Sequence, residues 1–132
     1  MLSKRIEEKI NKVLEPLKFD GVKLIDIRED GVELEMELDM DVLNYKGGLH
    51  GGMIFTLCDI CSGITMLSKG HKVTTLQGNI NYIKEGLVGP IFAKSKIVHK
   101  GRTTSVIDVD VIDGNMEVIA KGTFTMFILE NL

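Results

Sequence analysis

The chain of 132 residues has no tryptophan, only two cysteines and no excess of positive charge. Two cysteines are too few for the disulfide framework of a small secreted domain. The net charge of −3 lacks the basic footprint of a nucleic-acid-binding protein. Aromatic residues make up 5% of the chain, so any ligand pocket is expected to be aliphatic and not built for ring stacking.

The N-terminus lacks the uninterrupted apolar segment of a secretory signal, because residues 1–10 read MLSKRIEEKI. We therefore expect a cytoplasmic protein. The composition is 44% hydrophobic and 27% charged, which is ordinary for a soluble globular protein. Length and composition together predict one domain over residues 1–132.

Apolar residues recur at helical spacing between residues 3 and 17, where the sequence reads SKRIEEKINKVLEPL. Ser3 is a candidate N-cap and Pro16 marks an end. The pattern predicts an amphipathic helix within residues 1–17.

Alternating apolar and polar residues predict about six strands. The first two runs, 22–29 and 32–39, flank Asp30-Gly31, which is a strong hairpin signal. In the second run the apolar residues alternate with acidic ones, so one face is expected to be buried and the other wet. Turns separate four later runs, and their alternation favours an antiparallel meander; these runs are 73–85, 90–100, 102–113 and 115–129.

The segment expected to form the central helix is residues 51–69. It contains one acidic residue, Asp59, and one basic residue, Lys69, at its last position. A helix that is apolar all round is buried. A membrane span is disfavoured, because a span needs about 20 apolar residues and a central Asp costs about 3 kcal/mol in lipid. The predicted fold is therefore α+β, with an antiparallel sheet curled around a fully buried helix.

Asp59 is the unusual residue of this helix, because Asp is rarely buried unless it is paired or functional. No Lys or Arg lies within one helical turn of it. Burial would raise its pKa toward that of a useful general base. The alternative is a structural Asp that is hydrogen-bonded to the backbone, and the residues alone leave both interpretations open.

The loop before this helix is rich in glycine and contains His50. A helix N-terminus offers free N–H donors, and glycine lets a ligand approach the backbone closely. Together they favour a site for an anion or a developing oxyanion. The alternative is a structural role for each residue: the glycines form a tight loop, the histidine is hydrogen-bonded within the loop, and the asparagine occupies a turn. The residues concerned are Asn44, Gly47, Gly48, His50, Gly51 and Gly52.

Cysteine and histidine positions do not predict a metal site. Cys58 and Cys61 form a single C-x-x-C about two turns inside the helix, which favours two buried thiols over a redox pair or a zinc site. His71 and His99 show no ligand spacing relative to His50. The basic residues at 100–102 are either an ordinary turn or a phosphate contact.

The pattern Asn44-x5-His50-Gly51-Gly52-x6-Asp59 resembles the signature of hotdog-fold acyl-CoA thioesterases of the phenylacetate-degradation (PaaI) type. The resemblance runs from about residue 20 to residue 129. Later features that match are the strand TTLQGNINYI, the Gly-Pro turn at 89–90, the loop at 99–102 and the final strand.

The resemblance implies hydrolysis of an acyl-CoA to a free acid and CoA, with CoA as part of the substrate and no separate cofactor or metal. Gly51 N–H would polarise the carbonyl, and Asp59 would activate water or attack directly. Asn44 and His50 would orient the reactants, and Thr75 would help to hold the water. Loop residues Lys100, Gly101 and Arg102 would meet the phosphates of CoA.

The resemblance also implies a homodimer, or a dimer of dimers, with active sites at the dimer interface. Two residues depart from the family pattern: Cys58 stands where Ala is common, and Thr75 where Ser is common.

The alternatives to a thioesterase are a non-catalytic acyl-CoA-binding hotdog domain and a hotdog dehydratase. The dehydratase pairs its His and acid in other local motifs.

Overall fold

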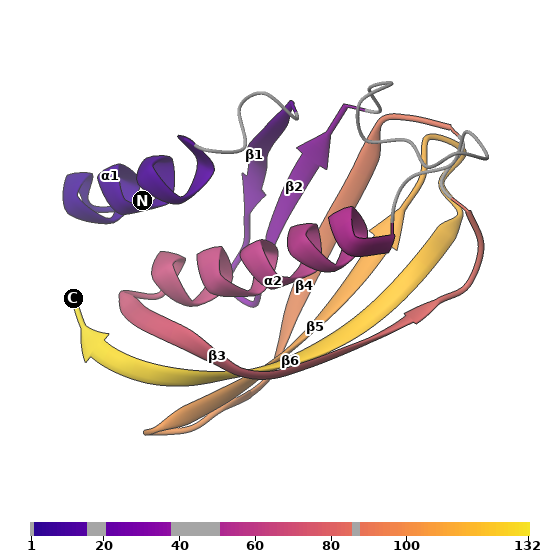
Figure 1. The fold of residues 1–132 in the computed structure, drawn as a ribbon. Coiled ribbons are helices and arrows are strands. Elements are labelled where there is room, and N and C mark those ends of the chain that lie inside the picture. The colour runs from indigo at the N-terminus through magenta and orange to yellow at the C-terminus, as the bar shows by residue number, and fades with distance from the viewer. Residues whose placement is uncertain (1, 16–20, 38–50, 86–87) are drawn as a thin grey trace.

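The computed structural model describes residues 2–15, 21–37, 51–85 and 88–132, which hold two helices and six strands. Figure 1 shows α2 lying along the inner side of one curved sheet, with α1 beside it. This arrangement confirms the predicted hotdog fold. The elements are α1 (Lys4–Leu14), β1 (Val22–Ile27), β2 (Val32–Met36), α2 (Gly51–Ser68), β3 (His71–Tyr82), β4 (Ile91–Lys100), β5 (Thr104–Ile112) and β6 (Val118–Asn131).

The six strands form one antiparallel sheet in the order β1-β2-β4-β5-β6-β3. The meander prediction is confirmed for β4, β5 and β6, which are consecutive neighbours. It is wrong for β3, which pairs with β6 and not with β4. The reason is that α2 carries the chain across the sheet from β2, so that β3 starts at the opposite edge.

Nine of the 18 residues of α2 are buried, eight are partly buried and Gly52 is exposed, so the helix is largely but not fully buried in the single chain, which corrects the prediction of a fully buried helix. The sheet covers its inner side, and the flank that carries Asp59 is partly open. By length and composition α2 is apolar enough to cross a membrane, but 56% of it is buried inside the fold, as in the core helix of a soluble protein. Its buried residues are Ile54, Leu57, Cys58, Cys61, Ser62, Ile64, Thr65, Met66 and Leu67.

A small buried polar cluster fixes α2 to the sheet. Thr65 Oγ1 and Ser95 Oγ share a hydrogen bond of 2.6 Å, and the Val32 backbone N–H donates to Ser95 Oγ at 2.8 Å. All three residues are fully buried. Because buried polar groups are stabilising only when they are paired, this cluster sets both the rotation of α2 and its position along its axis.

The β1–β2 hairpin forms where the Asp-Gly signal predicted it, with Arg28 N–H donating to Gly31 O at 2.8 Å. A side chain at position 31 would lie 2.0 Å from Ser95 O, so only glycine fits there. In β2 the residues Val32, Leu34 and Met36 are fully buried, which confirms the predicted alternation.

The N-terminal helix is also confirmed, with bounds Lys4–Leu14 inside the predicted 1–17. The side chain of Ser3 caps it by accepting from Ile6 N–H at 3.2 Å. Ile10 and Leu14 are its buried residues, and the helix packs against α2. The predicted end signal, Pro16, lies outside the described residues.

Candidate active site

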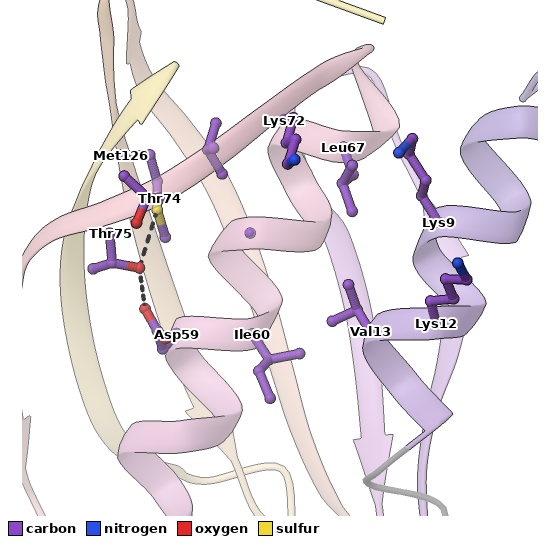
Figure 2. Close-up of a pocket in the computed structure, with 12 residues that line it drawn as sticks. Lys9, Lys12, Val13, Asp59, Ile60, Leu67, Lys72, Thr74, Thr75 and Met126 are labelled. Atoms are coloured by element: carbon purple, nitrogen blue, oxygen red, sulfur yellow. Dashed lines mark hydrogen bonds between the residues drawn. The ribbon is translucent and has the colours of Figure 1, made fainter. Parts of the chain in front are cut away.

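The structure brings together two of the residues singled out in the sequence, Asp59 on α2 and Thr75 on β3. The Thr75 hydroxyl donates to Asp59 Oδ1 at 2.6 Å, as Figure 2 shows. Its oxygen also lies 3.5 Å from the Met126 sulfur, which is a much weaker acceptor. A hydroxyl has one hydrogen, so the carboxylate receives it. The contact holds one oxygen of Asp59 in a fixed direction.

A β-bulge in β3 turns Thr75 toward α2. Thr75 pairs with Met126 and Gln77 with Thr125, so Leu76 is an extra residue without a partner on β6. Residues that are two apart in a strand have their side chains on the same face of the sheet. One inserted residue reverses this alternation for the residues that come after it. Because of the bulge, Thr75 and Gly78 face the same side of the sheet, although they are three residues apart. A Cβ added at Gly78 would lie 3.2 Å from Phe55 of α2, so this side faces the helix.

Asp59 is partly exposed in the single chain, which corrects the expectation of a buried carboxylate. The physical reason is the position of β3 at the sheet edge, since no further strand of the described residues covers the flank of α2 that carries Asp59. Among the described residues, Asp59 forms no ion pair. Its partner is the neutral hydroxyl of Thr75.

A cavity of about 420 Å³ opens beside Asp59 and Thr75, between α1, α2 and β3. Its volume lies in the range of small-molecule sites. The walls are mostly apolar, and three lysines stand around it. The lining residues are Lys9, Lys12, Val13, Asp59, Ile60, Gly63, Leu67, Lys72, Val73, Thr74, Thr75 and Met126.

The N-terminus of α2 begins at Gly51, as the oxyanion hypothesis requires. Tyr82, at the end of β3, donates its hydroxyl to Gly51 O at 2.8 Å. A Cβ on Gly51 would lie 3.2 Å from the Tyr82 ring. The close packing of this ring therefore favours glycine at position 51. The sequence analysis did not single out Tyr82. The one available signal was the alternation along β3, which places Tyr82 on the face of the strand that is turned toward α2. Asn44, Gly47, Gly48 and His50 lie outside the described residues.

The two cysteines are free, fully buried thiols, which confirms the prediction of two buried thiols. Burial raises the pKa of Cys61 to about 12 and raises that of Cys58 further above its ordinary value. Neither thiol is available as a thiolate nucleophile at neutral pH.

Lys100, Gly101 and Arg102 lie at the β4–β5 hairpin, where Gly101 N–H donates to Thr104 O at 2.8 Å. Lys100 pairs with Ser105, Ser105 with Met126, and Met126 with Thr75 across the sheet. Three strand spacings therefore separate Thr75 from Lys100, which is roughly 14 Å. The structure does not bring this loop into the Asp59 site of its own chain.

Among the described residues, no group of three or more His, Cys, Asp or Glu side chains is arranged to hold a metal ion. The groups that the described residues bring to this region are one carboxylate, one hydroxyl and one helix N-terminus. A carboxylate beside an open cavity can accept a proton from water or attack a carbonyl carbon.

A long helix packed along the inner side of one curved antiparallel sheet gives the chain the hotdog fold. The family model described as thioesterase superfamily matches residues 46–120, more than half of the sequence, and the chain belongs to this superfamily. The chain is a thioester hydrolase.

Solved structures of similar proteins support this assignment. A Streptococcus mutans protein bound to acetyl-CoA is 40% identical, with a TM-score of 0.80 and coverage of 86% of this chain and 92% of that one. A hypothetical thioesterase protein from Streptococcus pneumoniae, solved with coenzyme A, is 38% identical, with a TM-score of 0.81 and coverage of 86% of this chain and 92% of that one. That protein was also solved with an Asp-to-Ala and with a Thr-to-Ala replacement, at positions 16 residues apart, like Asp59 and Thr75.

The Escherichia coli protein PaaI, an acyl-coenzyme A thioesterase, shares the whole fold. Its structure has a TM-score of 0.88 and covers 99% of this chain and 98% of that one, at 21% identity. In sequence the two proteins are 24% identical over 101 residues, which is 76% of this chain and 72% of PaaI.

Proposed function

We propose that the chain hydrolyses acyl-CoA thioesters to a free acid and CoA, as a cytoplasmic enzyme that needs no metal. The observation that carries the proposal is the Asp59–Thr75 pair at the wall of a largely apolar cavity. The neighbours that bind acetyl-CoA and coenzyme A support CoA as the carrier of the acyl group.

In the proposed reaction, Asp59 takes a proton from a water molecule whose oxygen attacks the thioester carbonyl, or attacks that carbon itself. Thr75 holds Asp59 Oδ1, so that the carboxylate keeps one orientation while its other oxygen faces the reactants. The C–S bond then breaks, and the thiolate of CoA leaves and is protonated. If Asp59 attacked the carbon itself, a water molecule then hydrolyses the acyl–Asp59 anhydride, which releases the free acid and restores the carboxylate. A positioned base contributes about 10²–10⁴-fold to such a step.

The carbonyl oxygen needs a donor as charge develops on it, and we assign this role to the backbone N–H of Gly51 at the start of α2. One such donor is typically worth about 3 kcal/mol. Asn44 and His50, by the family pattern, orient the thioester and the water. Lys100, Gly101 and Arg102 bind CoA phosphates, which the pantetheine arm holds far from the thioester.

Asp59 and Gly51 of one chain are too far apart to serve one substrate. Both lie on α2, eight residues apart, which is roughly 12 Å along the axis. A general base acts within about 3 Å of its proton, or through one water. We therefore propose that the site is shared, with Asp59 of one chain acting at Gly51 of a second copy.

The edge strand β3 is the surface that supports such a dimer. It has 12 residues and, among the described strands, pairs on one side only, with β6. Leu76 and Tyr82 are more than half exposed on it in the single chain. Long unpaired edges with exposed apolar residues are templates for pairing with another chain. A homodimer, or a dimer of dimers, built on this edge would also cover the open flank of Asp59.

The alternative is a domain that binds acyl-CoA without hydrolysing it. A binding domain needs the CoA loop but no base, so the Asp59–Thr75 pair favours the enzyme. A thiol reagent distinguishes the two, because free CoA appears only on hydrolysis. The buried cysteines of the protein keep the background low.

The proposal is tested by Asp59→Asn, which should lower the turnover of acyl-CoA by at least about a hundredfold. The matched control is Asp108→Asn on the outer face of the sheet, where Asp108 likewise accepts from a threonine hydroxyl, that of Thr123, at 2.8 Å. The control should hydrolyse at the parent rate. Tight acyl-CoA binding by the parent without thiol release would favour the binding domain, and Asp59→Asn activity within tenfold of the parent would refute the base or nucleophile role.

A further inference from the structure

The cavity beside Asp59 is elongated along α2. Asp59, Gly63 and Leu67 are spaced by four residues, so they lie along one stripe of the helix, and all three line the cavity. Asp59 and Leu67 are eight residues apart, which is roughly 12 Å along the axis. The cavity therefore has a reacting end at Asp59 and a far end near Leu67, as Figure 2 shows.

Gly63, midway along this stripe, leaves open space. A Cβ added there would meet nothing within 4 Å, so packing within the chain does not require glycine. Glycine weakens the interior of a helix relative to alanine. The missing side chain at this position instead widens the cavity between its two ends.

Three lysines line the cavity: Lys9 on α1 and Lys72 on β3 stand near Leu67 at the far end, and Lys12 on α1 lies nearer to Val13 and the middle of the cavity, as Figure 2 shows. Among the described residues, none of the three lysines forms an ion pair or hydrogen bond with a carboxylate, and Asp59 is the only acid that lines the cavity. Three unpaired cations gather here in a chain whose net charge is −3. Like charges around a mostly apolar space are relieved by an anionic ligand.

We infer that the cavity takes an acyl group that runs from Asp59 over Gly63 and ends in a carboxylate between Lys9 and Lys72, with Lys12 beside its path. The inference rests on the proposed hydrolysis and gives its substrate class. The enzyme prefers ω-carboxyacyl thioesters over uncharged acyl thioesters of the same length. Gly63 and the three lysines determine this specificity and take no part in bond breaking.

Matched substrates test the preference. Adipoyl-CoA and hexanoyl-CoA have equal chain length and differ by the terminal carboxylate, as do sebacoyl-CoA and decanoyl-CoA. The ratio of their kcat/KM values cancels the contribution of CoA itself. We expect the charged member to be favoured by about fivefold or more at low salt, most in the longer pair, and less as salt screens the lysines.

Each lysine changed to methionine should lower this ratio by up to about fivefold, because methionine keeps an apolar stem without the charge. The control is Lys96→Met on the outer face of β4, which should leave the ratio unchanged. If all substrates are hydrolysed and the parent ratio is near one, the inference is wrong and the proposed function stands. If none is hydrolysed, the proposed function fails as well.

The phosphates of CoA are a second source of negative charge near lysines. Acyl thioesters of N-acetylcysteamine lack these phosphates and separate the two sources. If the lysines bind the acyl carboxylate, the ratio and its loss in the lysine variants persist with these short thioesters. If the variants lose activity only with CoA thioesters, the lysines bind phosphate and the inference is refuted.

Gly63→Ala and Gly63→Leu test the path of the acyl chain. Alanine should raise the Tm, because it removes a glycine from a helix interior. Both variants should lose activity on sebacoyl thioesters relative to acetyl thioesters, by about tenfold or more for leucine. An equal loss on both substrates, together with dissociation of the oligomer on size exclusion, would show that Gly63 is an interface residue and would overturn this path.

Discussion

Thr75→Val is the substitution that isolates the hydrogen bond at the centre of the proposed site. Valine keeps the shape of threonine and removes the hydroxyl that donates to Asp59 Oδ1 at 2.6 Å. Hydrogen bonds to charged groups are worth about 1.5–3 kcal/mol, which corresponds to roughly ten- to a hundredfold in rate. Because the carboxylate keeps its charge when the hydroxyl is removed, we expect at least the lower end, a fall in kcat of about tenfold or more.

The assay is the rate of CoA release at several acyl-CoA concentrations, which separates kcat from KM. Because the hydroxyl orients the base and does not touch the CoA moiety, kcat should fall with little change in KM. Thr75→Ser is the matched control, since it keeps the hydroxyl and should stay within about threefold of the parent. Equal activity of Thr75→Val and the parent, or equal losses in both variants, would refute the orienting role.

Two further predictions concern the loop and the core. Arg102→Ala should raise KM for acyl-CoA by about fivefold and leave hydrolysis of an acyl thioester without the nucleotide unchanged, because a phosphate contact adds uniform binding; equal losses on both substrates would make the loop structural. Burial raises the pKa of Cys61 from 9.0 to about 12, so its contribution to stability is complete below pH 9 and is lost as the pH rises toward 12. The free energy of unfolding should therefore fall less between about pH 8 and about pH 10 in Cys61→Ala than in the parent, and an equal fall would show that this thiol is not protected.

Local patterns in the sequence were sufficient for the parts of the fold that depend on neighbouring residues. The alternation of Val32, Leu34 and Met36 with acidic residues identified a strand with one buried face. The Asp30-Gly31 pair identified the hairpin before it. Ser3 identified the start of α1. Each of these signals acts over a few residues, so no knowledge of the rest of the chain is needed.

Long-range pairing was not readable in the same way. The position of β3 beside β6 depends on how α2 crosses the sheet, and the bulge at Leu76 depends on the register with β6. These two features bring Thr75 to Asp59. The family resemblance named Thr75, but no local pattern shows that its hydroxyl reaches a residue 16 positions away.

The apolar character of α2 was overinterpreted as complete burial. A helix that is apolar all round needs cover, but its sequence does not say whether a strand or a second chain provides it. In the single chain the sheet covers Cys58 and Cys61, and the flank with Asp59 stays partly open. The lysines of the cavity were missed for a similar reason, because α1 and β3 meet only in the folded chain.

The central claim is that Asp59 of one chain acts on a thioester held at the helix N-terminus of its partner. Subunit complementation tests it most directly, with Asp59→Asn in one chain and Asn44→Ala in the other, each inactive alone, refolded together in equal amounts. In a mixed dimer one site carries both lesions and the other none. Half of the dimers are mixed, so activity should recover to roughly a quarter of the parent value. A mixture that stays inactive despite proven subunit exchange would place the whole site within one chain and contradict the account.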